Sequence, residues 1–148
     1  MRILFCNYEY PPLGGGGGVI NALLAEELAK QHEVTVLTSQ GLGLPRHSVE
    51  NGVEIVRAPT VMRREESVAS MGSMMSFIPS GVITGRNLLN RKQFDIINTH
   101  FVLPTGPVGH ILSRFGKIPN VLSLHGGDLY DPSKTLSPHQ HWPFRVSI

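Results

Sequence analysis

The chain has 148 residues and a net charge of +2 at pH 7, with 41% hydrophobic and 16% charged residues. This length suits one domain with a hydrophobic core, and the balanced charge argues against the basic face that nucleic-acid binding requires. The one cysteine, Cys6, excludes an intrachain disulfide, and we expect it to be a small core residue of a cytoplasmic protein.

Strand and helix patterns alternate along the chain. The strand pattern is a short apolar run, and the helix pattern repeats apolar residues three or four positions apart. Strands are predicted at 2–7, 33–38, 53–58, 95–99 and 120–124, and helices at 19–31, 81–91 and 104–115. A polar loop is predicted at 41–52, and the tail at 129–148 gives no clear pattern. The alternation predicts an α/β fold, a Rossmann-like parallel sheet with helices on both faces.

Two apolar segments, at 19–31 and 60–80, are predicted to pack against the core. In the helix at 19–31, one stripe is apolar and is expected to pack on the sheet. The stripe consists of Ile20, Leu23, Leu24 and Leu28. At 60–80 the apolar residues, many of them methionine, should fill the core, with contact to an acceptor or a membrane surface as the alternative. Pro79 interrupts the uncharged stretch at 67–85, which we therefore do not expect to span a membrane.

Five consecutive glycines, Gly14, Gly15, Gly16, Gly17 and Gly18, lie between the first strand and the first helix. Such a loop presents bare backbone N–H groups and the positive end of the helix dipole, which suits a phosphate or another anion. A flexible connector is the alternative interpretation. The position of the run inside a strand–helix unit, rather than between domains, argues against that alternative.

Two common phosphate-binding loops do not fit this run. A Walker A loop needs a lysine after its last glycine, where this chain has Val19. A dinucleotide-binding loop needs the spacing G-x-G-x-x-G, and no register that starts on a glycine of the run also ends on one. The acidic residue that would bind a ribose after the second strand is missing too, because Thr38, Ser39 and Gln40 stand there. NAD binding is therefore disfavoured.

Three polar segments follow strands and should meet at one edge of the predicted sheet. The glycine run follows the first strand, His100 ends the fourth, and His125 and Asp128 follow the fifth. Ligands of parallel α/β sheets bind outside the carboxyl ends of the strands, so these residues are candidates for one site. Each histidine could instead be a hydrogen-bonded structural residue. Tyr8 and Glu9 either line the same cleft or form a solvated turn.

The histidines near the end of the chain do not predict a metal site. His139 and His141 could join Asp128 or Asp131, but the spacing is irregular and a second cysteine is missing. We therefore expect no bound metal ion.

Four segments resemble the family 4 glycosyltransferases, which have the GT-B fold. They are Pro11-Pro12-Leu13-Gly14-Gly15-Gly16, the stretch from Leu28 to Thr38, the stretch from Phe94 to His100, and Leu124-His125-Gly126-Gly127-Asp128. The resemblance runs over nearly the whole chain with the segments in the same order. It implies a retaining, metal-independent transfer of a sugar from a nucleotide-diphosphate sugar to a carbohydrate or lipid-linked acceptor, without a further cofactor.

The resemblance also implies roles for the candidate residues. The backbone at Gly14 to Gly17 would approach the diphosphate of the donor. His125 would act beside the reacting sugar, with Asp128 as its polar partner, and both would be catalytic. His100, Tyr8 and Glu9 would bind substrate on the acceptor side.

Enzymes of this family are much longer than this chain. By this resemblance, residues 1–148 would be the N-terminal, Rossmann-like, acceptor-side domain, truncated before its last strand and helix. The nucleotide-sugar domain would be absent too. We therefore expect the chain to be inert alone, because one glycine turn cannot neutralise a departing diphosphate. The alternative is a stand-alone sugar- or nucleotide-binding module without catalysis. Self-association through the exposed cleft face is a further expectation.

Overall fold

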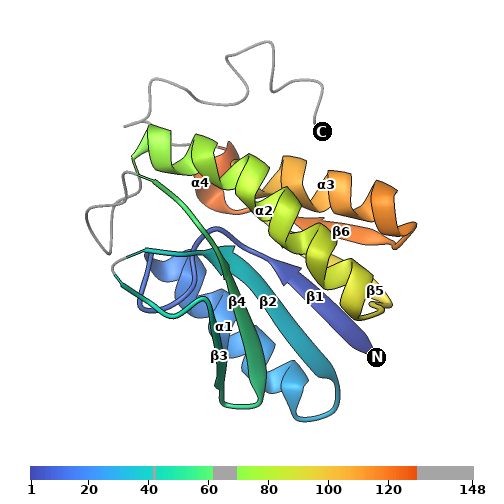
Figure 1. Ribbon diagram of the computed structural model, residues 1–148. Coiled ribbons are helices and arrows are strands. Elements are labelled where there is room, and N and C mark those ends of the chain that lie inside the picture. The colour runs from blue at the N-terminus through green and yellow to red at the C-terminus, as the bar shows by residue number, and fades with distance from the viewer. Residues whose placement is uncertain (42, 62–69, 130–148) are drawn as a thin grey trace.

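A computed structural model describes residues 1–41, 43–61 and 70–129. Within these ranges, six strands form one sheet that helices flank (Figure 1). The strands are β1 (Arg2–Cys6), β2 (Glu33–Ser39), β3 (His47–Glu50), β4 (Val53–Ala58), β5 (Ile96–His100) and β6 (Asn120–Ser123). The helices are α1 (Gly16–Ala29), α2 (Met71–Arg91), α3 (Thr105–Gly116) and the short α4 (Gly126–Leu129).

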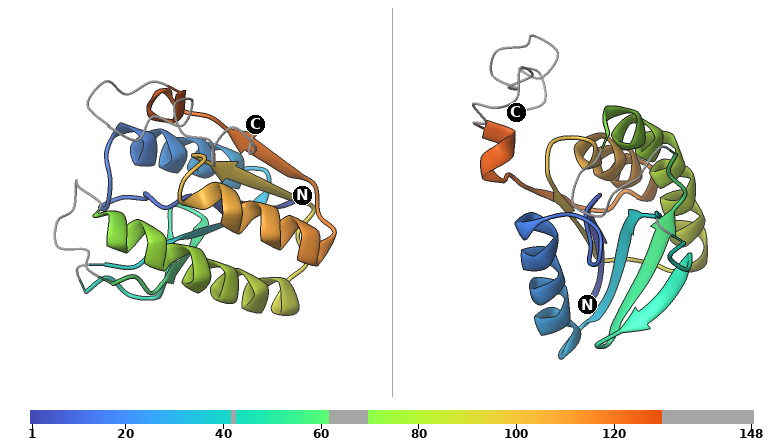
Figure 2. Two further views of the ribbon diagram at one scale, coloured as in Figure 1. Left: turned by 90° about the horizontal axis from the view of Figure 1, so that it is seen from above. Right: turned by 90° about the vertical axis from the view of Figure 1, so that its left-hand side faces the viewer.

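The sheet has the order β3-β4-β2-β1-β5-β6. All neighbouring strands run parallel except β3 and β4, which are antiparallel. The α1 helix lies on one side of the sheet and α2 and α3 on the other (Figure 2). The predicted α/β class with helices on both faces is thus confirmed, with one antiparallel strand added at the edge.

Strand β3 lies where the sequence predicted only a loop, and that part of the prediction is wrong. Glu50 and Val53 are paired, so Asn51 and Gly52 form a two-residue hairpin turn. Both turn residues have positive φ, 49° and 81°, as a type I′ turn requires. The Asn-Gly pair was a readable signal, but the exposed strand before it lacks the apolar run that identifies a buried strand.

Strand β1 is buried on both faces, and its side chains alternate between them. Ile3 and Phe5 belong to the core cluster that also holds residues of α1, whereas Leu4 and Cys6 belong to the cluster that holds residues of α2 and α3. Cys6 is fully buried, as expected, and burial raises the pKa of its thiol to about 12. The core therefore has two layers, one on each side of the central strands.

Helix α1 packs on the sheet with a different face from the predicted one. Its buried residues are Gly18, Asn21, Ala22 and Ala25, which are small enough to let the helix approach the sheet closely. Ile20 and Leu23 are 59% and 63% exposed, so most of the expected apolar stripe points away from the core, whereas Leu28 at its end packs against the core as predicted. The helix also begins at Gly16, which places three of the five glycines in its first turn rather than in a loop.

Helix α2 begins ten residues before the predicted start at residue 81, at Met71. The Ser70 hydroxyl accepts a hydrogen bond from the backbone N–H of Ser73 at 3.1 Å and caps the first turn. Pro79 lies inside the helix and, with the serines around it, hides the helical period in the sequence. Met74 packs partly against the core, whereas Met75 is 56% exposed.

None of the helices in the described ranges is long and apolar enough to cross a membrane.

Candidate functional site

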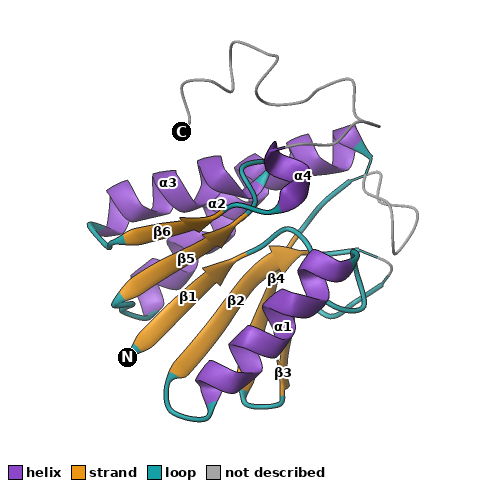
Figure 3. Cartoon of the chain, turned by 180° about the vertical axis from the view of Figure 1, so that it is seen from behind, coloured by secondary structure: helices purple, strands orange, loops and turns teal. Residues whose placement is uncertain are grey.

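The carboxyl ends of β1 and β5 lie next to each other in the sheet, and the chain leaves them in opposite directions along it (Figure 3). After β1 the chain continues to β2 on one side, and after β5 it continues to β6 on the other. This is the topological switch point at which α/β sheets bind their ligands. The five glycines at 14–18, called the glycine turn below, follow β1. His100 ends β5, and His125 follows β6. The predicted meeting of these segments at one edge is therefore correct.

His100 and His125 are in direct contact through their ring nitrogens. Nδ1 of His100 lies 3.0 Å from Nε2 of His125. His100 is only 3% exposed, and its ring stacks on that of Phe5 with the centroids 5.7 Å apart. Burial, and secondarily the nearby His125, lowers the pKa of His100 to about 4. His100 is therefore a neutral imidazole at neutral pH.

Asp128 connects the loops that follow β5 and β6. Its Oδ1 accepts the backbone N–H of Val102 at 3.0 Å, and its Oδ2 accepts the backbone N–H of His125 at 2.9 Å. The residue is 8% exposed. A buried carboxylate that accepts two N–H groups holds both loops in place, so Asp128 fixes the backbone from which the His125 side chain extends.

Phe101 is a site residue that the sequence interpretation missed. Its backbone has φ of 70°, in the left-handed region that a bulky residue rarely adopts. Its ring stacks on the His125 ring with the centroids 4.2 Å apart, and it also touches Gly17 so closely that a Cβ there would overlap it. Phe101 thus links the first turn of α1 to His125. The only sequence signal was its place directly after a strand-ending histidine.

The glycine turn already holds a carboxylate of the same chain. The backbone N–H of Gly15 donates to Oε2 of Glu9 at 3.2 Å. Gly14 has φ of +98°, which a residue with a side chain rarely adopts. A Cβ built at Gly15 or Gly16 meets no atom within 4 Å, so the space beside these two residues is open. A negative group at this helix end is electrostatically favourable, and here Glu9 supplies it.

Tyr8 lies in the core beneath this edge. It is 2% exposed, and its hydroxyl lies 2.7 Å from the hydroxyl of Ser73 on α2. Its ring meets that of Phe77 edge-on, and its backbone N–H donates to Oγ1 of Thr105. Tyr8 therefore joins α2 and α3 to the end of β1, and its predicted contact with substrate stays a prediction.

The part of the chain that the structure describes contains no group of three or more His, Cys, Asp or Glu side chains placed to hold a metal ion. His139, His141 and Asp131 lie outside the described residues. The same is true of residues 62–69, in the segment where acceptor or membrane contact was the alternative.

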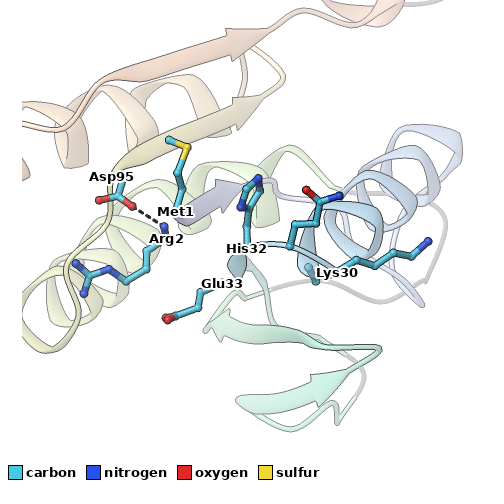
Figure 4. Close-up of a pocket in the computed structure, with 8 residues that line it drawn as sticks. Met1, Arg2, Lys30, His32, Glu33 and Asp95 are labelled. Carbon is cyan, nitrogen blue, oxygen red and sulfur yellow. Dashed lines mark hydrogen bonds between the residues drawn. The ribbon is translucent and has the colours of Figure 1, made fainter.

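A polar hollow of about 540 Å³ lies at the opposite, amino-terminal edge of the sheet (Figure 4). Met1, Arg2, His32, Glu33 and Asp95 are among the residues that line it, and the backbone N–H of Arg2 donates to Oδ2 of Asp95 at 2.6 Å. None of the residues around this hollow belongs to the predicted site. The candidate site is therefore the carboxyl edge and not this hollow.

Comparison with known proteins gives a match to a family and a shorter local match to one relative. The Glycosyltransferase Family 4 profile matches residues 14–147. A stretch of 54 residues, 36% of the chain, is 33% identical to an uncharacterized glycosyltransferase, MJ1178, of Methanocaldococcus jannaschii and covers 15% of that protein.

Two solved structures of sucrose-phosphate synthase from Thermosynechococcus elongatus share the fold. One superposes with a TM-score of 0.64 at 13% identity over 85% of this chain and 64% of that structure. The other superposes with a TM-score of 0.69 at 14% identity over 99% of this chain and 38% of that structure. The chain thus spans well under half the length of this second structure and a smaller share still of the curated relative.

Proposed function

Because the chain belongs to glycosyltransferase family 4, we propose that it forms the N-terminal, acceptor-side domain of a glycosyltransferase. The donor is a nucleotide-diphosphate sugar, and the acceptor is a carbohydrate or a lipid-linked molecule. The transfer retains the anomeric configuration and needs no metal ion. Contact with a membrane surface and self-association remain predictions about the partners of this domain.

One observation carries the proposal: the glycine turn, His100, His125 and Asp128 converge at the switch point of the sheet. The first N–H groups of a helix have no partner within the helix, and they point along its positive dipole end. In α1 these groups lie in the glycine turn, where no side chain at Gly15 or Gly16 blocks an approaching diphosphate. Phe101 fixes the distance between this turn and His125.

Each residue then has a role in the proposed transfer. Gly16 donates its backbone N–H to the diphosphate, whose negative charge grows as it leaves, and Gly15 does the same once the diphosphate displaces the Glu9 carboxylate from its N–H. His125 lies beside the reacting sugar, and Asp128 holds the His125 backbone. The dipole of α1 supplies only part of the charge stabilisation that a departing diphosphate needs, and positioned cations supply most of it. We therefore propose that these cations come from the nucleotide-binding half of the enzyme and that this half-site alone is inert.

The test is an assay of sugar transfer and of donor hydrolysis by the chain alone, with UDP-, GDP- and ADP-sugars. We expect no turnover, and clear turnover would contradict the proposed inertness. In a longer protein that joins this chain to a nucleotide-binding domain, His125→Ala should lower kcat by roughly a hundredfold, the usual scale for a positioned group at the reacting centre. Activity within about twofold of wild type would demote His125 to a structural residue. Nucleotide-sugar binding without turnover in that longer protein would favour a binding module instead.

A further inference from the structure

The contact between His100 and His125 contains one hydrogen atom whose position decides what His125 can do. In a neutral imidazole one ring nitrogen carries a hydrogen and the other accepts. Nδ1 of His100 and Nε2 of His125 lie 3.0 Å apart, so one of them donates and the other accepts. Two arrangements are open: either His100 donates, or His125 does.

The surroundings of His100 decide between these arrangements. Its other nitrogen, Nε2, is buried and has no hydrogen-bond partner among the described residues. If His125 donated, the hydrogen of His100 would lie on this Nε2 and would be a buried donor without an acceptor. If His100 donates from Nδ1, only a lone pair stays unpaired, and folded proteins tolerate an unpaired acceptor better than an unpaired N–H group.

A doubly protonated His100 is disfavoured by what packs around it. Phe5 of β1 covers its ring, and the buried carboxylate at the same edge of the sheet, Asp128, accepts hydrogen bonds from the backbone N–H groups of Val102 and His125. Burial, with a smaller contribution from His125, keeps the pKa of His100 at about 4, so the ring is neutral at neutral pH. The single hydrogen of a neutral His100 therefore lies on Nδ1, in the contact with His125.

We propose that His100 is a positioning residue: its Nδ1–H donates to Nε2 of His125 and holds His125 in the tautomer that carries its hydrogen on Nδ1. Phe101 stacks on the His125 ring and Asp128 holds its backbone N–H, so ring, backbone and tautomer are all fixed. His125 then offers its ligand an N–H donor, and Nε2 is not available as a proton acceptor. The ligand group that this donor fits is an oxygen acceptor, such as a sugar hydroxyl or a phosphate oxygen.

The statement about the ligand rests on the proposed function, whereas the statement about the tautomer does not. The tautomer is measured on this chain alone, without substrate, by long-range nitrogen–hydrogen correlation spectra of the imidazole rings near pH 7.5. Because protonated and bare ring nitrogens differ widely in chemical shift, each ring is assigned directly. We expect a bare Nε2 and a protonated Nδ1 on His125, and a protonated Nδ1 on His100. A protonated Nε2 on His125 would overturn the proposal, whatever the turnover assay gives.

Three variants test whether His100 sets this tautomer. His100→Asn places an amide nitrogen close to where Nδ1 lies, so we expect His125 to keep its single tautomer. His100→Leu removes the donor, and His125 should lose the single tautomer and show a mixture of both forms. His110→Asn removes an exposed histidine of α3 and should leave the His125 spectrum unchanged. An unchanged His125 tautomer in folded His100→Leu would overturn the proposal. If His100→Leu does not fold, the wild-type and His100→Asn spectra still decide it, because both must show the same bare Nε2.

Discussion

The ring of Phe101 and the backbone of Gly17 are in contact, and no side chain fits between them. The face of the same ring stacks on the imidazole of His125. Phe101 is therefore held from two sides, and this explains how a bulky residue keeps a left-handed backbone, which is unfavourable in itself. The glycine at position 17 matters here because it allows a close approach of the aromatic ring, and not because it is flexible.

Gly17→Ala should destabilise the fold through this contact. The added Cβ overlaps the Phe101 ring, which cannot move freely because it stacks on His125. Overpacking of this kind costs typically about 1–3 kcal/mol, more than the alanine gains in helix propensity. Urea unfolding measures the effect, and Gly16→Ala is the matched control because its Cβ meets nothing within 4 Å. Equal stability of the two variants would contradict the contact, whereas Phe101→Ala should relieve the loss in Gly17→Ala.

Asp128→Asn should destabilise the edge of the sheet and disturb His125. The carboxylate accepts two backbone N–H groups, from Val102 and His125, and an amide can accept only one of them. The buried donor that loses its acceptor costs about 1–3 kcal/mol, which urea unfolding measures. Asp95→Asn, at the opposite edge, is the control: its amide oxygen can still accept the N–H of Arg2. A shift of the His125 ring signals in Asp95→Asn as large as in Asp128→Asn would argue against a specific role of Asp128.

The sequence predicted the sheet better than the helices, for a physical reason. Buried strands are short and apolar on both faces, and each predicted strand is present. Helix α1 misled the interpretation because its inward face is made of glycine, asparagine and alanine, which carry no hydrophobic signal, while Ile20 and Leu23 face outward. The buried face of a helix is predicted from the polarity of its side chains, but close packing of a helix on a sheet depends on side-chain size.

The meeting of the site residues was predictable, but their contacts with one another were not. The rule that ligands bind at the carboxyl ends of parallel strands is enough to predict that His100 and His125 lie at one edge of the sheet. The link through Phe101 and the hydrogen bond from Gly15 to Glu9 depend on side-chain directions, which spacing along the chain does not give. Asp128 likewise contacts backbone N–H groups, which no side-chain motif encodes.

Glu9→Gln should strengthen the binding of pyrophosphate to the glycine turn. The Glu9 carboxylate accepts the N–H of Gly15, so an incoming diphosphate competes with a negative charge for that group. An electrostatic contribution of about 0.3–1 kcal/mol at a helix end corresponds to a two- to fivefold change in affinity. Titration with inorganic pyrophosphate, followed at the Gly15 amide signal, measures it. Glu27→Gln, further along α1, should change the affinity less, and weaker binding in Glu9→Gln than in wild type would contradict competition at Gly15.

The free energy of unfolding should decrease as the pH is lowered from 6.5 to 5, because His100 resists protonation in the folded protein. Its pKa is lowered from 6.5 to about 4, so the unfolded chain binds this proton at a higher pH than the folded protein does. The stabilisation is complete above pH 6.5 and is lost progressively as the pH falls toward 4.

A second group with a shifted pKa is Glu54, whose side chain is half-buried. Burial raises the pKa of Glu54, but hydrogen bonds from His47, Thr35 and Lys92 outweigh this and lower it overall. A lowered carboxylate pKa contributes stability above its ordinary value of 4.5 and loses it below. In the interval from pH 6.5 to pH 5, the free energy of unfolding therefore reports on His100 rather than on Glu54.

Urea unfolding at pH 7.5, 6.0 and 5.0 tests the effect of His100 within that interval. We expect the free energy of unfolding of the wild-type protein to decrease as the pH is lowered. That of His100→Asn should decrease less, because asparagine does not titrate. His110→Asn, which removes an exposed histidine, should follow the wild-type slope. Parallel slopes for wild type and His100→Asn would mean that His100 accepts a proton without disturbing the fold. That result would contradict the proposal that His100 is neutral and donates a hydrogen bond to His125.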